Sequence, residues 1–133
     1  MADIVKLAEA VAAEITEPVK AEVLFAPELD LKTLKEMRII VVPVGIDMKP
    51  LSRGCSEDSL KVQIGVLKKC TEDDVPELVK LVETLGRSFL DKRLTDATCM
   101  AVKYNPLYSP EHLRERRQFT GVIELTFLTV VNR

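Results

Sequence analysis

The last segment of the chain, RQFTGVIELTFLTVVNR (residues 117–133), constrains the fold more than any other part of the sequence. Apolar residues such as Phe119, Ile123 and Phe127 alternate with polar ones such as Glu124, which is the period of a half-buried β-strand. The pattern continues for about a dozen residues, nearly twice the usual strand length. We therefore expect a central core strand here, held by pairing on either side.

Two earlier segments have the spacing of amphipathic helices. In residues 3–16 the apolar residues recur at intervals of three and four, with Asp3 available as the N-cap. Residues 71–90 begin with the acidic sequence TEDD, which favours the positive end of a helix. Asp74 and Glu77 are expected to form a capping box there. The apolar stripe of each segment predicts one buried helix face.

Four further segments have the composition of strands, and they cover residues 20–27, 38–45, 60–67 and 96–104. The segment 38–45 is apolar on both faces and contains Pro43, which makes a central position in the sheet less favourable. A polar connector with at most one helical turn is expected at 28–37. A short helix that begins at Pro110 is expected within residues 105–117.

The order of these elements predicts an α+β fold in a single domain. We expect a largely antiparallel sheet of about five strands, with two long helices packed on one face and a long hairpin loop. The opposite face would carry Ile40, Val42 and Val44, together with Leu128 and Val130. Because two helices cannot hide both faces, we expect these apolar residues to mark a surface for a partner.

Residues 45–59, GIDMKPLSRGCSEDS, are expected to form a long exposed loop, because they contain two glycines and a proline and no clear period. Two interpretations remain open. The segment is either a variable surface insertion between two strands or an arm that reaches a neighbouring subunit, and its length favours the arm. The candidate contact residues within it are Asp47, Lys49, Arg53 and Asp58.

Composition and charge exclude several classes of function. The 133 residues are enough for one domain with an ordinary core, and the net charge of −2 gives no general attraction to nucleic acid or anionic membranes. No apolar run approaches the roughly 18 residues of a membrane span, so no membrane partner is expected. Cys55, Cys70 and Cys99 match no zinc or redox spacing, and the start of the chain lacks the pattern of a signal peptide. We therefore expect a reducing cytoplasm.

No group of residues in the sequence indicates a catalytic, cofactor or metal site, and we expect none. His112 is the only histidine and is expected at the surface or at a helix cap. Cys70 and Cys99 lie at the end of one strand and inside another, where small buried hydrophobic residues are expected. The glycines are scattered and form no phosphate-binding loop.

One basic cluster lies near the end of the chain. The sequence LRERR places Arg114, Arg116 and Arg117 beside the tyrosine-bearing segment YNPLYSP, a combination also found on nucleic-acid-binding surfaces. Glu111 and Glu115 dilute the charge, so a solvated or interfacial cluster is favoured. We expect no sequence-specific nucleic-acid binding.

The layout of the chain resembles the tail terminator, or tail completion, proteins of long-tailed bacteriophages. The similarity covers nearly the full length and consists of layout and apolar patterns. It comprises the N-terminal amphipathic helix, the strand AEVLF, the connector LDLKTLKEMRIIVVP, the strand VQIGV, the helix DDVPELVKLVETL and the final RRQFTGVIELTF.

This resemblance implies a structural virion protein that forms a ring, usually hexameric, on the end of the tail tube. Such a ring ends tail polymerisation and provides the surface that joins the tail to the neck or connector. The implied partners are other copies of the chain, the tail tube protein and the neck or connector protein, with a sheath protein as a further candidate, and DNA would pass through the ring. The implied location is the tail or neck of the virion, after assembly in the host cytoplasm. Residues 47–58 and 39–44 become candidate subunit contacts.

Two other functions remain open. One is a small cytosolic ligand-binding or regulatory α+β domain with a pocket on its sheet, which a stabilising metabolite would reveal. The other is an enzyme with a dispersed site, in which Arg114 or His112 would be required for activity.

Overall fold

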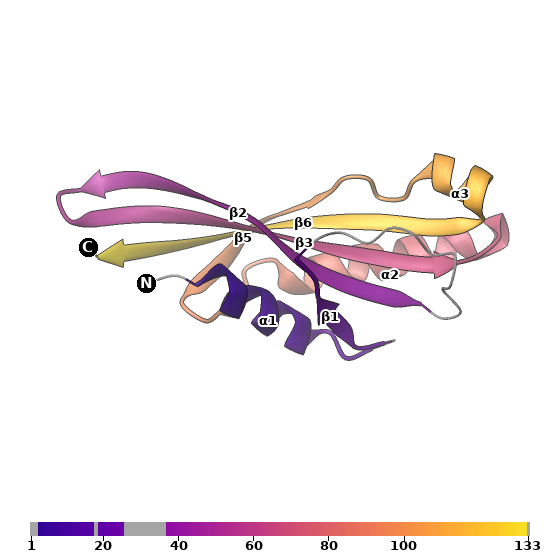
Figure 1. The fold of residues 1–133 in the computed structure, drawn as a ribbon, viewed down its shortest axis with the longest axis horizontal. Helices are drawn as coiled ribbons and strands as arrows, with labels where there is room; N and C mark the ends of the chain where they lie inside the picture. The colour runs from indigo at the N-terminus through magenta and orange to yellow at the C-terminus, as the bar shows by residue number, and fades with distance from the viewer. Residues whose placement is uncertain (1–2, 18, 26–36, 133) are drawn as a thin grey trace.

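The computed structural model describes residues 3–17, 19–25 and 37–132, which form an α+β fold (Figure 1). The predicted connector at 28–37 lies outside these residues, apart from Met37. The elements in chain order are α1 (Ile4–Glu14), β1 (Ala21–Val23), β2 (Arg38–Ser52), β3 (Cys55–Lys69), a 3-10 turn η1 (Glu72–Asp74), α2 (Val75–Phe89), β4 (Arg93–Leu94), β5 (Ala97–Tyr104), α3 (Pro110–Arg116) and β6 (Gln118–Asn132).

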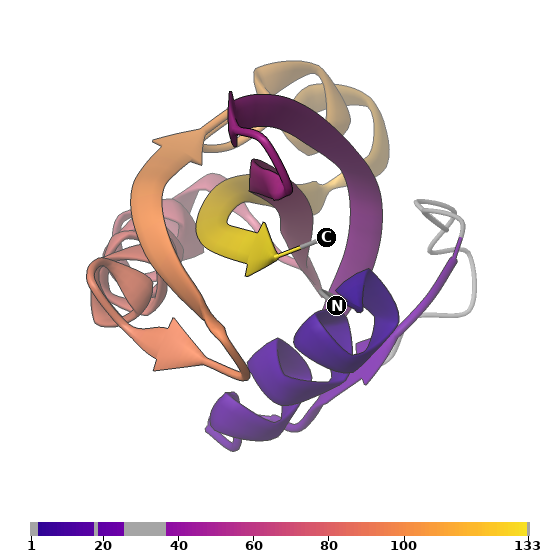
Figure 2. The ribbon, with the colours of Figure 1, turned by 90° about the vertical axis from the view of Figure 1, so that its left-hand side faces the viewer.

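A single sheet of six strands, in the order β1-β2-β3-β6-β5-β4, forms the body of the molecule. Its last strand, β6, pairs antiparallel with β3 on one side and β5 on the other, which confirms the predicted core strand at the end of the chain. The prediction of a largely antiparallel sheet of about five strands needs correction, because β1 pairs parallel with β2 and the two-residue β4 adds a sixth strand. The end-on view in Figure 2 shows that the strands twist and curl around the long axis.

Both long helices form where the sequence predicts them, and both bury their apolar residues in one core. Leu7 and Val11 of α1 are buried, as are Leu78 and Val82 of α2. They belong to the same hydrophobic cluster as Phe127 of β6. The two helices therefore cover the same face of the sheet, as expected for a two-layer α+β fold.

The starts of the two helices are capped in different ways. Asp3 is the N-cap of α1, as predicted, and its Oδ1 accepts a hydrogen bond from the backbone N–H of Val5 at 3.0 Å. The capping box predicted between Asp74 and Glu77 does not form. Instead, the Asp74 carboxylate accepts a hydrogen bond from the backbone N–H of Thr71 at 3.3 Å, because the 3-10 turn before α2 moves the cap three residues earlier.

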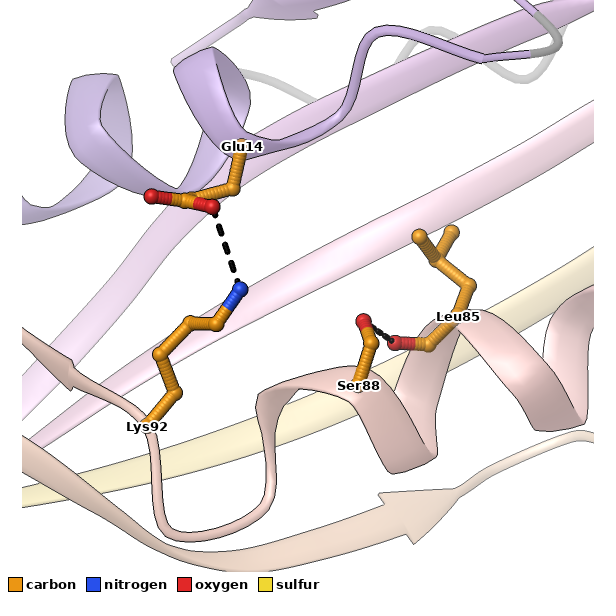
Figure 3. A network of polar contacts seen from close by, with 4 residues as sticks. All are labelled: Glu14, Leu85, Ser88 and Lys92. Carbon is orange, nitrogen blue, oxygen red and sulfur yellow. Dashed lines mark hydrogen bonds and ion pairs between the residues drawn. The ribbon is translucent and has the colours of Figure 1, made fainter.

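An ion pair joins α1 to the segment that follows α2 (Figure 3). Lys92 Nζ lies 3.1 Å from Glu14 Oε2 and 5.4 Å from the centre of the Phe89 ring. In the last turn of α2, Ser88 Oγ donates a hydrogen bond to the Leu85 carbonyl oxygen at 2.6 Å. Because the charged side chains are partly exposed, the pair contributes less than about 1 kcal/mol to stability.

Gly86 in α2 is required by the close approach of Tyr104 from β5. Tyr104 Oη donates a hydrogen bond to the Glu83 carbonyl oxygen at 2.8 Å, and a Cβ atom at residue 86 would lie 2.4 Å from Oη. We predict that Gly86→Ala lowers the free energy of unfolding by about 1–2 kcal/mol, although alanine favours a helix over glycine by about 1 kcal/mol. Urea denaturation measures this change.

A second variant provides the control for this prediction. Tyr104→Ala removes the ring that Gly86 accommodates. In that background Gly86→Ala should cause no further loss of stability, since the added methyl group no longer meets the ring. A Gly86→Ala protein as stable as the wild type would contradict the prediction.

The second face of the sheet is not the uncovered apolar surface that the sequence predicts. Ile40 and Val42 are only 2% and 7% exposed, because they form a small cluster with Leu67 and Leu24 of the same chain. These two residues therefore need no partner to shelter them.

Further along the same face the sheet is polar. Gln63 of β3 pairs with Glu124 of β6, and Gln63 Nε2 donates a hydrogen bond to Glu124 Oε1 at 3.5 Å. The neighbouring Lys61 is exposed. Of the apolar residues predicted for this face, Val44 and Val130 are exposed. Both lie toward the end of the sheet that extends past the helices.

Candidate functional site

The segment predicted as a loop, residues 45–59, is instead the end of a long β-hairpin. β2 and β3 pair down to a two-residue turn, Arg53–Gly54, in which Gly54 has φ of 84°, a conformation that favours glycine. The last residues of β6 pair with the other side of β3. We call this three-stranded extension, residues 44–59 and 128–132, the arm. Figure 1 shows that it projects beyond the helices.

In the folded arm, the side chains of β2 alternate between the two faces of the ribbon. Ile46, Met48 and Pro50 alternate with charged residues and point to one face. Pro50 lacks a backbone N–H and is tolerated, because β1 pairs with β2 only at Ile39–Val41 and the outer edge of β2 has no strand partner beyond this point in the described part of the chain.

Five of the nine exposed large hydrophobic residues in the described part of the chain lie in the arm. Met48 is 70% exposed and Val130 is 61% exposed, and Val44, Ile46 and Leu51 are exposed as well. In the body of the molecule, α1 and α2 cover one face of the sheet, but the arm extends past the start of α1. Strand edges and apolar side chains that are exposed together usually mark a surface for a partner.

The predicted contact residues in the arm fall into two groups. Lys49 and Arg53 are exposed, and Asp47 is exposed while forming an ion pair with Lys61, whose Nζ lies 3.1 Å from Asp47 Oδ2. Asp58 is 4% exposed, because it lies on the middle strand of the arm, and is therefore not available as a direct contact.

Asp58 has a structural partner inside the arm. Its Oδ1 accepts a hydrogen bond from Ser56 Oγ at 3.0 Å, and both residues are buried. The predicted contacts Ile40 and Val42 are also buried within the chain. Burial within the single chain does not support these three residues as contacts, and their role in an assembly stays a prediction.

A pocket of about 520 Å³, which we call the basal pocket, lies at the base of the arm. It is formed by the start of α1, the turn between β4 and β5, and the sheet. The turn is fixed to β6, because Thr129 Oγ1 donates a hydrogen bond to the Asp96 carbonyl oxygen at 2.7 Å. The lining residues are Asp3, Ile4, Lys6, Ile46, Leu60, Thr95, Asp96, Ala97 and Thr129.

The basic cluster lies at the other end of the molecule, on and after α3 (Figure 1). Arg114, Arg116 and Arg117 are all exposed, as expected for a solvated cluster. The Arg117 carbonyl oxygen accepts a hydrogen bond from the Cys70 N–H at 2.9 Å. Two hollows beside α3 are each lined by Arg114 and by Glu72, so opposite charges meet there and the surface is not uniformly basic.

His112 is more buried than the sequence predicts. Its backbone N–H donates a hydrogen bond to Ser109 Oγ at 3.3 Å, and its Nδ1 lies 2.9 Å from Thr120 Oγ1 on β6. The side chain therefore docks α3 onto the sheet. The alternation in β6 placed Thr120 away from the helix-covered face, but no signal in the sequence indicated that α3 would reach it.

The described residues contain no grouping of three or more His, Cys, Asp or Glu side chains that could hold a metal ion. Within the same part of the chain, no helix is both long enough and apolar enough to cross a membrane.

The three thiols are expected to differ in reactivity. Burial raises the pKa of both the Cys70 thiol and the Cys99 thiol, and Cys55 is half-buried in the arm. Because the thiolate is the reactive form, we predict that a disulfide reagent modifies Cys55 first in the folded protein and reaches the other two only after unfolding. Counting modified thiols with and without denaturant measures this, and rapid modification of all three in buffer would contradict it.

The raised pKa values of Cys70 and Cys99 also predict how the stability of the protein depends on pH. The unfolded chain releases the protons of Cys70 and Cys99 near the ordinary thiol value of 9.0, whereas the folded chain holds them to higher pH. The folded state then binds more protons, so stability falls as pH rises above about 9. A variant with serine in place of both Cys70 and Cys99 should lose less stability than the wild type as pH rises above about 9.

Comparison with known proteins adds no relative. No protein-family model matches the sequence, and no curated protein matches it.

Proposed function

We propose that the protein is a structural subunit that assembles with copies of itself into a closed ring, with the arm as the principal contact. The observation that carries the proposal is the arm, a three-stranded ribbon that extends past the helices and exposes apolar side chains. In this arrangement the arm of one copy contacts a surface of its neighbour that is not the neighbour's own arm. Such head-to-tail contacts close into rings when the rotation between subunits allows it.

The exposed area indicates that each contact is weak by itself. Full burial of an aliphatic side chain contributes about 1.5–3 kcal/mol, and the five apolar side chains of the arm are already partly buried. About 5 kcal/mol is therefore available from them, which is close to the lower estimates of the free energy lost when two molecules associate. A closed ring, in which every subunit has two neighbours, is consequently more stable than an isolated pair.

We further propose, from the sequence resemblance, that the ring belongs to the tail terminator class. In this proposal a ring of six copies, the usual number in that class, caps the tail tube, ends tail polymerisation and offers its other side to the neck or connector. The role requires no enzymatic activity and no cofactor. Its partners are other copies of the chain, the tail tube protein and the neck or connector protein, and the assembled location is the virion tail or neck.

A tube-growth assay tests this function. Purified protein is added to polymerising tail tube protein encoded in the same genome, and tube length is measured by electron microscopy. We expect shorter tubes that carry extra density at one end. Tubes of unchanged length and without end density would contradict the tail terminator role.

A second candidate function is supported by the basal pocket. Its volume of about 520 Å³ lies within the range of small-molecule sites, roughly 300–1,000 Å³. A small ligand-binding or regulatory domain is therefore the alternative. A thermal-shift screen separates the two functions, since a metabolite that stabilises a strictly monomeric protein would favour ligand binding over ring assembly.

A further inference from the structure

We propose that the basal pocket of each copy receives the tip of the arm from the next copy. This inference rests on the proposed ring and specifies which surface of the neighbour the arm contacts. Three features of the structure support it: the chemistry of the arm tip, the chemistry of the pocket, and the distance between them within one chain.

The tip of the arm is apolar and positively charged. Residues 48–55, MKPLSRGC, contain two cationic residues, Lys49 and Arg53, and no acidic residue. Both cations are exposed, as are the apolar side chains of Met48 and Leu51. The tip therefore combines positive charge with aliphatic surface. These two properties fit a pocket that has apolar walls and carboxylates at its edge.

The basal pocket has the complementary character. Ile4, Leu60 and Ala97 supply apolar wall, and the exposed carboxylates of Asp3 and Asp96 are part of its lining. Lys6 also lines the pocket, which leaves a net charge of −1 among the lining residues. Guanidinium groups bind carboxylates in a bidentate geometry, so Arg53 is the residue best suited to reach these aspartates.

The basal pocket is already formed in the single chain. Asp96 is held by the hydrogen bond from Thr129 to its carbonyl oxygen, and Asp3 is held by its role as the N-cap of α1. A preformed site loses less conformational entropy on binding than a mobile one. The aspartates can thus accept a cation without rearrangement of the backbone.

The arm cannot fill the pocket of its own chain. Ile46 of β2 lines the pocket, and Arg53 lies in the turn after β2, about 23 Å further along the hairpin at the usual rise per residue. The strand is hydrogen-bonded to β3 throughout, so it cannot fold back. An arm tip that fills this pocket must therefore come from a second copy, and such a contact is head-to-tail.

Cysteine cross-linking tests the inference. In a Cys55→Ser background, Ser52→Cys at the arm tip is combined with Thr95→Cys at the pocket, which leaves Arg53 and Asp96 in place, and the protein is treated with a short bismaleimide. We expect a ladder of covalent multimers on denaturing gels. The matched control combines Ser52→Cys with Glu77→Cys, an exposed position on α2, and should give far less cross-linking.

Charge exchange provides the second measurement. Arg53→Asp should weaken assembly by about tenfold or more, and addition of Asp96→Arg should restore most of the loss. If the wild type assembles but the 52/95 cysteine pair cross-links no better than the control pair, the pocket inference is overturned while the ring proposal stands. If the wild type never assembles, both are overturned.

Discussion

Replacing Met48 and Leu51 with glutamate is expected to convert the assembled protein to monomers and to leave its fold intact. Both side chains are exposed on the arm, so carboxylates there remain hydrated in the single chain. In an assembled ring the same carboxylates would be buried without a partner, which costs several kcal/mol. We expect assembly to weaken by more than about a hundredfold, measured by sedimentation velocity.

The chain contains a matched control for this double variant. Leu90 and Met100 are exposed to a similar extent but lie outside the arm. Glutamate at these two positions adds the same charge and should leave assembly unchanged. Equal effects of the two double variants would show that net charge, rather than the arm, controls association.

Gly121→Ala is expected to cause the largest loss of stability of any single methyl addition to the described glycines. A Cβ atom at residue 121 would lie 2.8 Å from the Leu107 carbonyl oxygen and 3.2 Å from both Phe119 and Val82. The nearest atom belongs to the backbone, which cannot rotate away as a side chain does.

The segment that contains Leu107 is also fixed to β6. Asn105 N–H donates a hydrogen bond to the Val122 carbonyl oxygen, and Val122 N–H donates one to the Pro106 carbonyl oxygen, both at 2.9 Å. Relief of the clash therefore requires at least one of these bonds to lengthen. We expect the free energy of unfolding to fall by about 2–3 kcal/mol, measured by urea denaturation.

Gly45→Ala is the control for Gly121→Ala. Both glycines lie in strands, but a Cβ atom at residue 45 would have no other atom within 4 Å. Since alanine restricts the unfolded chain more than glycine, Gly45→Ala should be neutral or slightly stabilising. If both variants unfold at the same urea concentration, the proposed clash at Gly121 is contradicted.

The sequence predicts the helices and the last strand well because each satisfies a single, uninterrupted period. Asp3 and the apolar stripe after it locate α1, and the alternation from Phe119 to Phe127 locates β6. In each case local pattern and tertiary packing favour the same structure, so the pattern alone is sufficient.

The arm could not be recognised from its sequence as a ribbon. Its β2 strand contains Pro50, and the facing part of β3 places Ser56 and Asp58 where a core strand would carry apolar residues. These features favour a loop when read locally. They are compatible with a strand here because Pro50 lies on an edge and the two polar residues satisfy each other by a hydrogen bond.

The error about the second sheet face has a different origin. The period of β3 correctly places Leu67 on that face, and the apolar pattern of β2 places Ile40 and Val42 beside it. What the sequence does not indicate is that Leu24, which follows a short parallel strand, returns to cover them. A long-range contact of this kind leaves no periodic signal in a single segment.

The mass of the purified protein in solution, measured by light scattering over a range of concentrations, tests most directly whether the arm joins copies of the chain. If the chain forms a ring, we expect a discrete species whose mass is a fixed multiple of the 14.9 kDa chain. The multiple is about six if the resemblance extends to stoichiometry. We expect this species to dissociate on dilution. A species of 14.9 kDa at every concentration, with or without tail tube protein, would contradict ring assembly.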